Sequence, residues 1–447
     1  MNTPIVDFVK DYAQSGKTRF HMPGHKGVSF FVGEEFDITE IRGADELYVP
    51  DGIILESERN AASLFGTSRT VYSAGGSTQS IHAMLYLAFV RAAKNGKKPF
   101  VLAGRNAHKA FIYAASKLDF DVRWIYPEQD AGLCRCVITP QMLENCLREC
   151  DYMPFAVYVT SPDYLGGISD IQALSAVCKA YGVPLLVDNA HGAYLAFCEK
   201  NQHPINLGAD MCCDSAHKTL PVLTGGGYLH IAADDSFGFS YDAVRAMSIF
   251  GSTSPSYLIM QSLDMCNLYV SRKIRTDIND CVTCTDKIRQ VMKQCGVDDV
   301  SDEPLKIAAD FRNKNIVGFD NAGDYFRGFD IEPEFADRDF VVFMISPFNT
   351  QRDFERLENA FENIKPENCT RPQVRFVKGE SAVSIRDAIF SFNEEVEVKN
   401  AVGRVCAAPT VSCPPAIPVA VSGEIITQKH ISILEYYGVD KIAVVKI

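Results

Sequence analysis

The sequence has little positive charge and no long apolar run. Its 44 lysines and arginines are outnumbered by 56 aspartates and glutamates, giving a formal net charge of −12. This surplus disfavours binding to nucleic acid or to an anionic membrane surface. No segment is long and apolar enough to cross a bilayer, and the first residues lack the apolar core of a secretory signal. We therefore expect a cytoplasmic protein with neither a nucleic-acid nor a membrane partner.

Metal-binding motifs are also lacking, although the chain has 15 cysteines. Cys281 and Cys284 have metal-like spacing, but no second pair lies nearby, and Cys134 and Cys136 have no histidine at ligand spacing. Without a secretory signal, the cysteines are interpreted as reduced thiols, most of them buried as small apolar side chains. We expect no metal site.

The length and the pattern of the chain predict an α/β fold with two domains. The 447 residues exceed one ordinary domain, and 47% of them are hydrophobic, which is enough for a sizeable core. From Pro99 onward short apolar strands alternate with helices, which is typical of a mainly parallel sheet. A second strand-rich region begins near Phe340. We expect an N-terminal arm (1–45), a large domain (46–285) and a smaller α+β C-terminal domain (286–447).

A lysine stands at the centre of the stretch from Asp214 to Pro221. Lys218 follows an apolar run, and Ser215 and His217 flank it. A lysine amine can bond covalently to an aldehyde cofactor, and pyridoxal 5'-phosphate (PLP) is the usual one. Lys218 is therefore a candidate for the lysine that binds PLP, with Ser215 and His217 near the phosphate. The alternative is a solvated surface lysine.

Asp188 is the candidate partner of the pyridine nitrogen. It follows the apolar run 183–187 and stands thirty positions before Lys218. A carboxylate in contact with the pyridine nitrogen keeps the ring protonated and able to accept electrons. The alternative for Asp188 is a helix cap or a turn residue.

A glycine-rich loop predicts a phosphate site. The strand expected at 70–73 leads into Ala74-Gly-Gly-Ser-Thr-Gln79, and a helix is expected at 81–92. Backbone N–H groups at such a turn face an anion, and Ser77 and Thr78 add hydroxyl donors. The spaced third glycine of a dinucleotide fingerprint is absent.

Several candidates share one position relative to the expected strands. Gly76, His108, Ser161, Asp188 and Lys218 each come just after a strand, where ligands gather in open α/β sheets. There His108 could stack on the cofactor ring and meet the substrate carboxylate, although a lone histidine is more often structural.

By these residues the sequence resembles the bacterial Orn/Lys/Arg decarboxylases. Three segments carry the resemblance: His21–Gly27, Ser215–Pro221, and Pro414–Pro418 followed by Gly423-Glu424. The resemblance is to the short form of the family, in the fold-type-I PLP (aminotransferase-like) superfamily. It implies decarboxylation of arginine, lysine or ornithine to the corresponding amine by a homodimer, or a higher assembly, with shared active sites.

The resemblance also implies roles for individual residues. Lys218, Asp188 and His108 would be catalytic, and Glu424 would lie near the cationic end of the substrate, where Asp45 and Glu46 are further candidates. Thr253 and Ser254 would reach the phosphate of a neighbouring subunit. The implied cofactor site is Gly76, Ser77, Thr78, His108, Asp188, His191, Ser215, His217, Lys218, Thr253 and Ser254.

The sequence departs from the family pattern at Gly75, at Gly225–Gly227, at Cys413 and at Ala416. These departures leave the choice of substrate open. Two alternatives also stay open: another fold-type-I PLP enzyme (an aminotransferase or a lyase), because one fold hosts many chemistries, and a PLP-binding protein whose substituted loops no longer turn over.

Overall fold

The computed structural model describes residues 1–92, 96–127, 133, 135–319, 321–372, 374–409 and 417–446. The chain divides into two compact units. Unit 1 comprises Met1–Ala93, Phe155–Val157 and Ile171–Thr276, and unit 2 comprises Lys94–Pro154, Tyr158–Asp170 and Asp277–Ile447. Among the described residues, no helix has both the length and the apolarity that a membrane span requires. Cys134, Cys413 and Ala416 lie outside the described residues.

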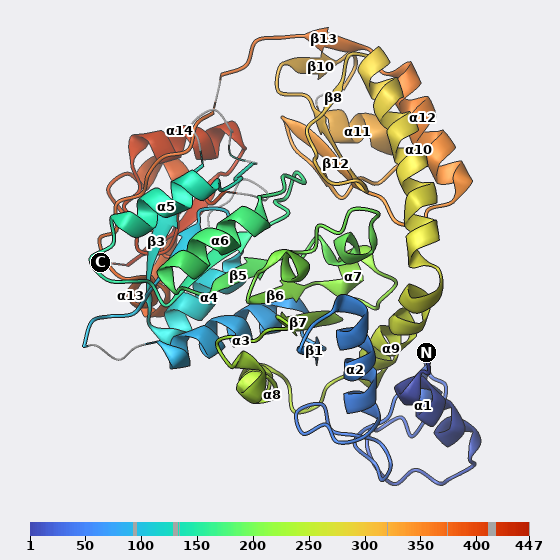
Figure 1. Ribbon diagram of the computed structural model, residues 1–447. Coiled ribbons are helices and arrows are strands. Elements are labelled where there is room, and N and C mark those ends of the chain that lie inside the picture. The colour runs from blue at the N-terminus through green and yellow to red at the C-terminus, as the bar shows by residue number, and fades with distance from the viewer. Residues whose placement is uncertain are drawn as a thin grey trace. The chain divides into compact units, whose positions relative to one another are not determined.

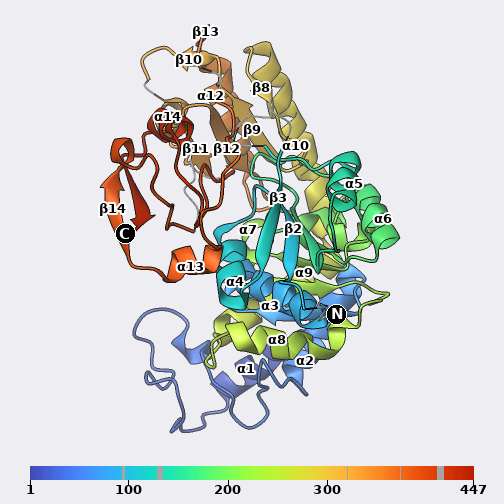
Figure 2. The ribbon, with the colours of Figure 1, turned by 90° about the vertical axis from the view of Figure 1, so that its left-hand side faces the viewer.

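The largest sheet has seven strands in the order β1-β7-β6-β5-β4-β2-β3. β5 and β6 run parallel, as do β2 and β3, whereas β7 is antiparallel to β1 and β6 (Figures 1 and 2). This mainly parallel sheet confirms the predicted fold class. The strands are β1 (Arg69–Ser73), β2 (Phe100–Gly104), β3 (Asp121–Ile125), β4 (Ala156–Thr160), β5 (Leu185–Asp188), β6 (Met211–Asp214) and β7 (Gly227–Ile231).

Unit 1 places helices against β1 and β5–β7, whose side chains form its core. Val187, Cys212 and Leu229 have no exposed surface, as expected for strands covered on both faces. The helices of the unit are α1 (Pro4–Gln14), α2 (Ile53–Phe65), α3 (Gly76–Arg91), α6 (Ile171–Tyr181), α7 (Ala216–Thr219), α8 (Ala243–Phe250) and α9 (Tyr257–Arg272). Short 3₁₀ helices are η1 (Glu34–Phe36), η3 (Ala193–Phe197), η4 (Pro204–Leu207) and η5 (Phe239–Asp242).

Unit 2 contains β2 and β3 and the smaller sheets. A four-stranded antiparallel sheet has the order β11-β12-β9-β8, and β10-β13 and β14-β15 form two-stranded sheets. These strands are β8 (Asp298–Asp299), β9 (Lys306–Asp310), β10 (Lys314–Ile316), β11 (Phe335–Ala336), β12 (Phe340–Met344), β13 (Pro366–Asn368), β14 (Asn393–Glu397) and β15 (Lys441–Val445). The helices are α4 (Lys109–Leu118), α5 (Pro140–Arg148), α10 (Ile274–Gln294, which begins before the unit boundary), α11 (Ala322–Arg327), α12 (Gln351–Asn363), α13 (Ile385–Phe390), η6 (Val398–Asn400) and α14 (Gln428–Tyr436).

The glycine run after the lysine motif is required by close packing. A β-carbon on Gly227 would lie 2.7 Å from the carbonyl oxygen of Asp214 and 3.3 Å from the carbonyl carbon of Gly76. A β-carbon on Gly226 would lie 2.3 Å from a methyl carbon of Val222. The start of β7 therefore approaches the end of β6 and the start of α3 too closely for any side chain.

Replacing Gly227 by alanine is expected to destabilise unit 1. The new methyl group meets backbone atoms that cannot move independently, so we expect a loss of about 1–3 kcal/mol. Thermal unfolding followed by circular dichroism measures it. Gly24→Ala is the matched control, because a β-carbon there meets no atom within 4 Å. Equal melting temperatures for the two variants would contradict this packing.

A buried ion pair links two distant parts of unit 2. Arg105 Nη1 and Nη2 donate to the two carboxylate oxygens of Glu424 at 2.6 and 2.8 Å, and both side chains are almost fully buried. Removal of one partner leaves the other charge buried without compensation, which typically costs 3–5 kcal/mol.

We expect Glu424→Gln to lower the free energy of unfolding by about 3–5 kcal/mol. The matched control is Glu397→Gln, since Glu397 pairs with Lys399 at 2.7 Å on the surface and exposed pairs contribute little. Melting temperatures of the two variants give the comparison. A Glu424→Gln protein as stable as Glu397→Gln would show that Arg105 is solvated.

Candidate active site

Lys218 lies in α7, the short helix that follows β6. Its side chain is exposed, and its Nζ lies 3.0 Å from Nε2 of the buried His191. The lysine thus presents an accessible amine with an imidazole in hydrogen-bond contact. An amine and an imidazole at this distance can exchange a proton.

Asp188 ends β5 and is 2% exposed. Its Oδ1 accepts from the backbone N–H of Ala190 at 3.2 Å and lies 3.6 Å from the thiol of Cys213. Asp188 and Cys213 are register partners in the parallel β5–β6 pair. The two strands end at the same edge, so Asp188 and the segment that carries Lys218 leave the sheet together.

The expected phosphate loop and the lysine motif touch each other. Ser215 Oγ donates to Ser77 Oγ at 2.8 Å, and Gly76 N donates to Gly225 O at 2.7 Å. Gly76 has φ +66°, a left-handed conformation that favours glycine. From this turn starts the 16-residue helix α3, whose first N–H groups have no acceptor within the helix.

α3 begins five residues earlier than the Ile81 start expected from the apolar periodicity. Gly76, Ser77 and Thr78 are weak helix formers, but Ser73 holds the first turn, because its Oγ lies 2.7 Å from Gly76 O and 2.9 Å from Gln79 Oε1 and can donate to either. Ser77 and Thr78 therefore occupy the helix N-terminus, where the dipole favours an anion.

These residues fit a pyridoxal phosphate group by the chemistry of their donor set. The helix N-terminus and the Ser77 and Ser215 hydroxyls suit a phosphate, Lys218 supplies an amine for an aldehyde, and Asp188 supplies a carboxylate for a ring nitrogen. His217, whose Nδ1 lies 2.9 Å from Gly226 O, belongs to the same cluster.

His108, Thr253 and Ser254 have exposed side chains. His108 belongs to unit 2, and its Nδ1 accepts from the N–H of Ala110 at 3.2 Å, which caps α4. Thr253 and Ser254 lie in the exposed bend between α8 and α9. Their roles toward the cofactor stay predictions.

Glu424 is placed by its ion pair with Arg105. Its Oε2 also accepts from Val421 N at 2.9 Å, and a β-carbon on Gly379 would lie 2.1 Å from its carboxylate carbon. A cationic substrate group could bind Glu424 only in competition with Arg105. The sequence analysis did not single out Arg105; its position just after β2 was the available signal.

Asp45, the further candidate for the substrate cation, serves as a cap for α2. Its two oxygens accept five backbone N–H groups, among them Gly52 at 2.9 Å and Ile54 at 3.0 Å. These contacts compensate its charge within unit 1. Its neighbour Glu46 is exposed.

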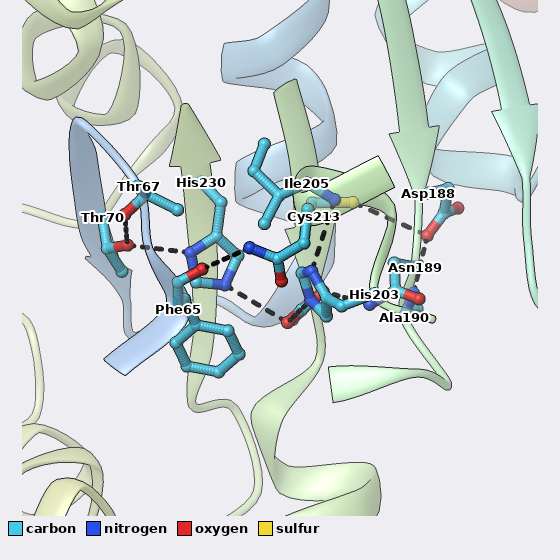
Figure 3. A network of polar contacts seen from close by, with 12 residues as sticks. Phe65, Thr67, Thr70, Asp188, Asn189, Ala190, His203, Ile205, Cys213 and His230 are labelled. Atoms are coloured by element: carbon cyan, nitrogen blue, oxygen red, sulfur yellow. Dashed lines mark hydrogen bonds and ion pairs between the residues drawn. The ribbon is translucent and has the colours of Figure 1, made fainter. Parts of the chain in front are cut away.

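Four buried polar residues near the site were missed by the sequence analysis. Asn189, His203 and His230, which Figure 3 labels, each contact the carboxylate of Asp214. Asp214 stands four positions before Lys218, and that proximity was the only signal in the sequence. His203 and His230 come from separate segments that no spacing rule connects.

Family models and known proteins agree on the relationship of the chain. The family model "Orn/Lys/Arg decarboxylase, major domain" matches residues 3–366, and the C-terminal domain model of the same family matches residues 377–442. An arginine decarboxylase of Bacillus subtilis (strain 168) is 28% identical over 96% of this chain and 92% of its own length. An arginine decarboxylase of Halalkalibacterium halodurans is also 28% identical, over 96% of this chain and 92% of its own length.

Solved structures share the fold at lower identity. The lysine decarboxylase LdcF of Francisella novicida superposes with a TM-score of 0.79 at 16% identity, covering 99% of this chain and 81% of its own. The constitutive lysine decarboxylase of E. coli gives 0.78 at 17% identity, covering 100% and 82%. At this identity the likeness shows the fold alone.

The two family models together span nearly the whole sequence, and the chain therefore belongs to the Orn/Lys/Arg decarboxylase family, a family of pyridoxal-phosphate-dependent amino-acid decarboxylases.

Proposed function

We propose that the protein uses PLP to decarboxylate a basic amino acid, with arginine as the preferred substrate. The observation that carries the proposal is the β5–β6 register, in which Asp188 pairs with Cys213, five residues before Lys218. The register brings two groups to one edge of the sheet. Asp188 is the acid proposed for the ring nitrogen, and Lys218 is the amine proposed for the aldehyde. The arginine decarboxylases that match along nearly their full length support the choice of arginine.

The residues of unit 1 would hold the cofactor as follows. When bound, PLP supplies an aldehyde for an amine and a ring that accepts electrons from the substrate. The N-terminus of α3, with Ser77, Thr78 and Ser215, would hold the phosphate. Asp188 would hold a proton on the ring nitrogen.

Lys218 and its neighbour His191 are the groups proposed to transfer protons. Decarboxylation releases carbon dioxide and requires one proton on the α-carbon of the product. Lys218 Nζ and His191 Nε2 lie 3.0 Å apart, so either group can deliver that proton and recover it from the other. His108 remains the proposed contact for the ring face and the substrate carboxylate.

The proposed function is tested with purified protein, PLP and arginine, lysine and ornithine in parallel. We expect one agmatine and one carbon dioxide per arginine consumed, with lysine and ornithine at least ~10-fold poorer in kcat/KM because their ammonium groups leave guanidinium partners unsatisfied. Amines are measured by mass spectrometry.

Variants and products identify the source of failure. Lys218→Ala should abolish activity and the covalent attachment of the cofactor by borohydride that is expected for the wild-type protein, whereas Lys200→Ala, at an exposed lysine of unit 1, should retain both. Keto acid in place of carbon dioxide would show an aminotransferase. A yellow wild-type protein that consumes no amino acid would show a binder without turnover.

We further propose that the enzyme is a homodimer or a higher assembly. The N-terminal arm exposes a group of large apolar side chains between residues 20 and 32. Phe20, Phe30 and Phe31 are 93%, 94% and 83% exposed. Exposed apolar surface larger than that of a typical monomer marks interaction sites, and we propose that a second copy of the chain covers these side chains.

We expect the wild-type protein to have at least twice the 49.4 kDa mass of one chain in multi-angle light scattering. The double variant Phe30→Asp with Phe31→Asp should shift toward the monomer, because charge would be buried at the interface. Tyr241→Asp is the control, since Tyr241 is also 92% exposed but lies outside the arm. A wild-type monomer would contradict the assembly.

A further inference from the structure

The carboxylate of Asp214, at the end of β6, is fully buried and is held by three side chains. Asn189 Nδ2 donates to Oδ1 at 2.7 Å. His203 Nε2 and His230 Nε2 lie 2.9 and 3.2 Å from Oδ2. Figure 3 shows Asn189, His203 and His230 on separate segments of unit 1. None of the four residues has a role in the reaction described above.

The other nitrogen of each imidazole indicates that both histidines donate to Asp214. His203 Nδ1 accepts from the backbone N–H of Ile205 at 3.4 Å, so its proton is on Nε2. His230 Nδ1 contacts Thr70 Oγ1 at 2.8 Å, and burial lowers the pKa of His230 although Asp214 opposes the shift. A neutral His230 that accepts from Thr70 also carries its proton on Nε2.

This arrangement favours a hydrogen-bonded carboxylate over a metal ion. Two histidines and an aspartate lie close enough to hold a metal, but a metal would need the lone pairs of both Nε2 atoms. Burial alone would raise the pKa of Asp214, yet the two imidazoles outweigh it and hold that pKa well below its ordinary value. Asp214 is therefore an anion stabilised by three N–H donors.

The carboxylate joins the two segments that carry the proposed cofactor contacts. On one side, Asn189 follows Asp188 directly, and its backbone N–H also donates to Cys213 O at 3.0 Å. On the other side, Asp214 precedes Ser215, whose hydroxyl contacts Ser77. A shift of Asp214 would therefore move the acid for the ring nitrogen relative to the phosphate loop.

We propose that Asp214 is a positioning residue that sets the spacing between Asp188 and the Ser215–Lys218 segment through its contacts with Asn189, His203 and His230. This inference rests on the proposed function. Asp214 would act through geometry, since a misplacement of about 1 Å in a preorganised site can lower the reaction rate about 100-fold.

The structure offers a substitution that removes the charge and keeps the contacts. Asn189 Oδ1 is buried and has no hydrogen-bond partner. In Asp214→Asn, the new amide oxygen can accept from both histidines, and Asn189 can turn so that its oxygen accepts from the new NH₂ group. Asp214→Ala removes all three contacts.

Asp210 provides a matched control at the other end of the same strand. It directly precedes β6 and is 5% exposed, and its Oδ2 accepts from Leu185 N, at the start of β5, at 2.8 Å. Asp210→Ala thus removes a buried carboxylate that ties the same two strands. Ligands gather at the opposite, carboxyl ends of the strands.

Each apoprotein is titrated with PLP, and binding is followed by absorbance. The melting temperature is also measured, together with the fraction of Lys218 to which borohydride attaches the cofactor covalently. We expect Asp214→Ala to raise the Kd for PLP by about 10- to 100-fold, Asp214→Asn to stay near wild type, and Asp210→Ala to lose stability without a change in Kd. Measurements are made well below the lowest melting temperature, so that unfolding does not enter the Kd.

Each other outcome has one meaning. An equal Kd for Asp214→Ala and Asp210→Ala would overturn the positioning role. So would an Asp214→Asn protein as weak as Asp214→Ala, because charge and not geometry would then decide. A stoichiometric metal ion in the purified protein, measured by plasma mass spectrometry, would overturn the hydrogen-bonded arrangement. A wild-type protein that does not bind PLP would refute the proposed function instead.

Discussion

The parallel pairing of β5 with β6 determines where the polar groups of unit 1 leave the sheet. Asp188 is the register partner of Cys213, so Asp188 and Asn189 emerge beside Asp214 and the lysine motif. A slip of one residue would turn alternate side chains to the opposite face of the sheet. The strand residues Leu185 to Val187 and Met211 to Cys213 are fully buried, and close packing on both faces resists that slip because each side chain would enter a space shaped for another. The core thereby fixes the spacing of the site.

Much of this fold could be predicted because the strong patterns are local. The helix expected at 171–181 is α6, Ile171–Tyr181, and the rule that ligands gather at the carboxyl ends of parallel strands was sufficient to group Asp188 with Lys218. The contacts that were missed depend on tertiary structure. Glu424 meets Arg105 across 319 positions of the chain, and His203 and His230 meet Asp214 only because η4 and β7 bring them there. No period or spacing in a sequence encodes such meetings.

Three buried acids show why burial of a carboxylate does not by itself indicate chemistry. Asp45 is satisfied by backbone N–H groups at a helix start, Glu424 by a guanidinium, and Asp214 by an amide and two imidazoles. An isolated buried charge is costly, so each acid needs such partners whatever its function. The partners decide the interpretation: a cap holds one helix, an ion pair joins two segments of unit 2, and the Asp214 contacts join segments that both border the candidate site.

The departures from the family pattern can be separated by the same reasoning. Gly225–Gly227 depart from the family pattern, yet a β-carbon on Gly226 would meet Val222, a β-carbon on Gly227 would meet Asp214 and Gly76, and Gly225 O accepts from Gly76 N. These glycines let the chain approach the start of α3, where the phosphate would bind. Close packing thus accounts for the run, and the run does not argue for lost turnover. Differences in substrate then depend on residues that contact the far end of the amino acid, where a single unsatisfied polar group changes preference strongly.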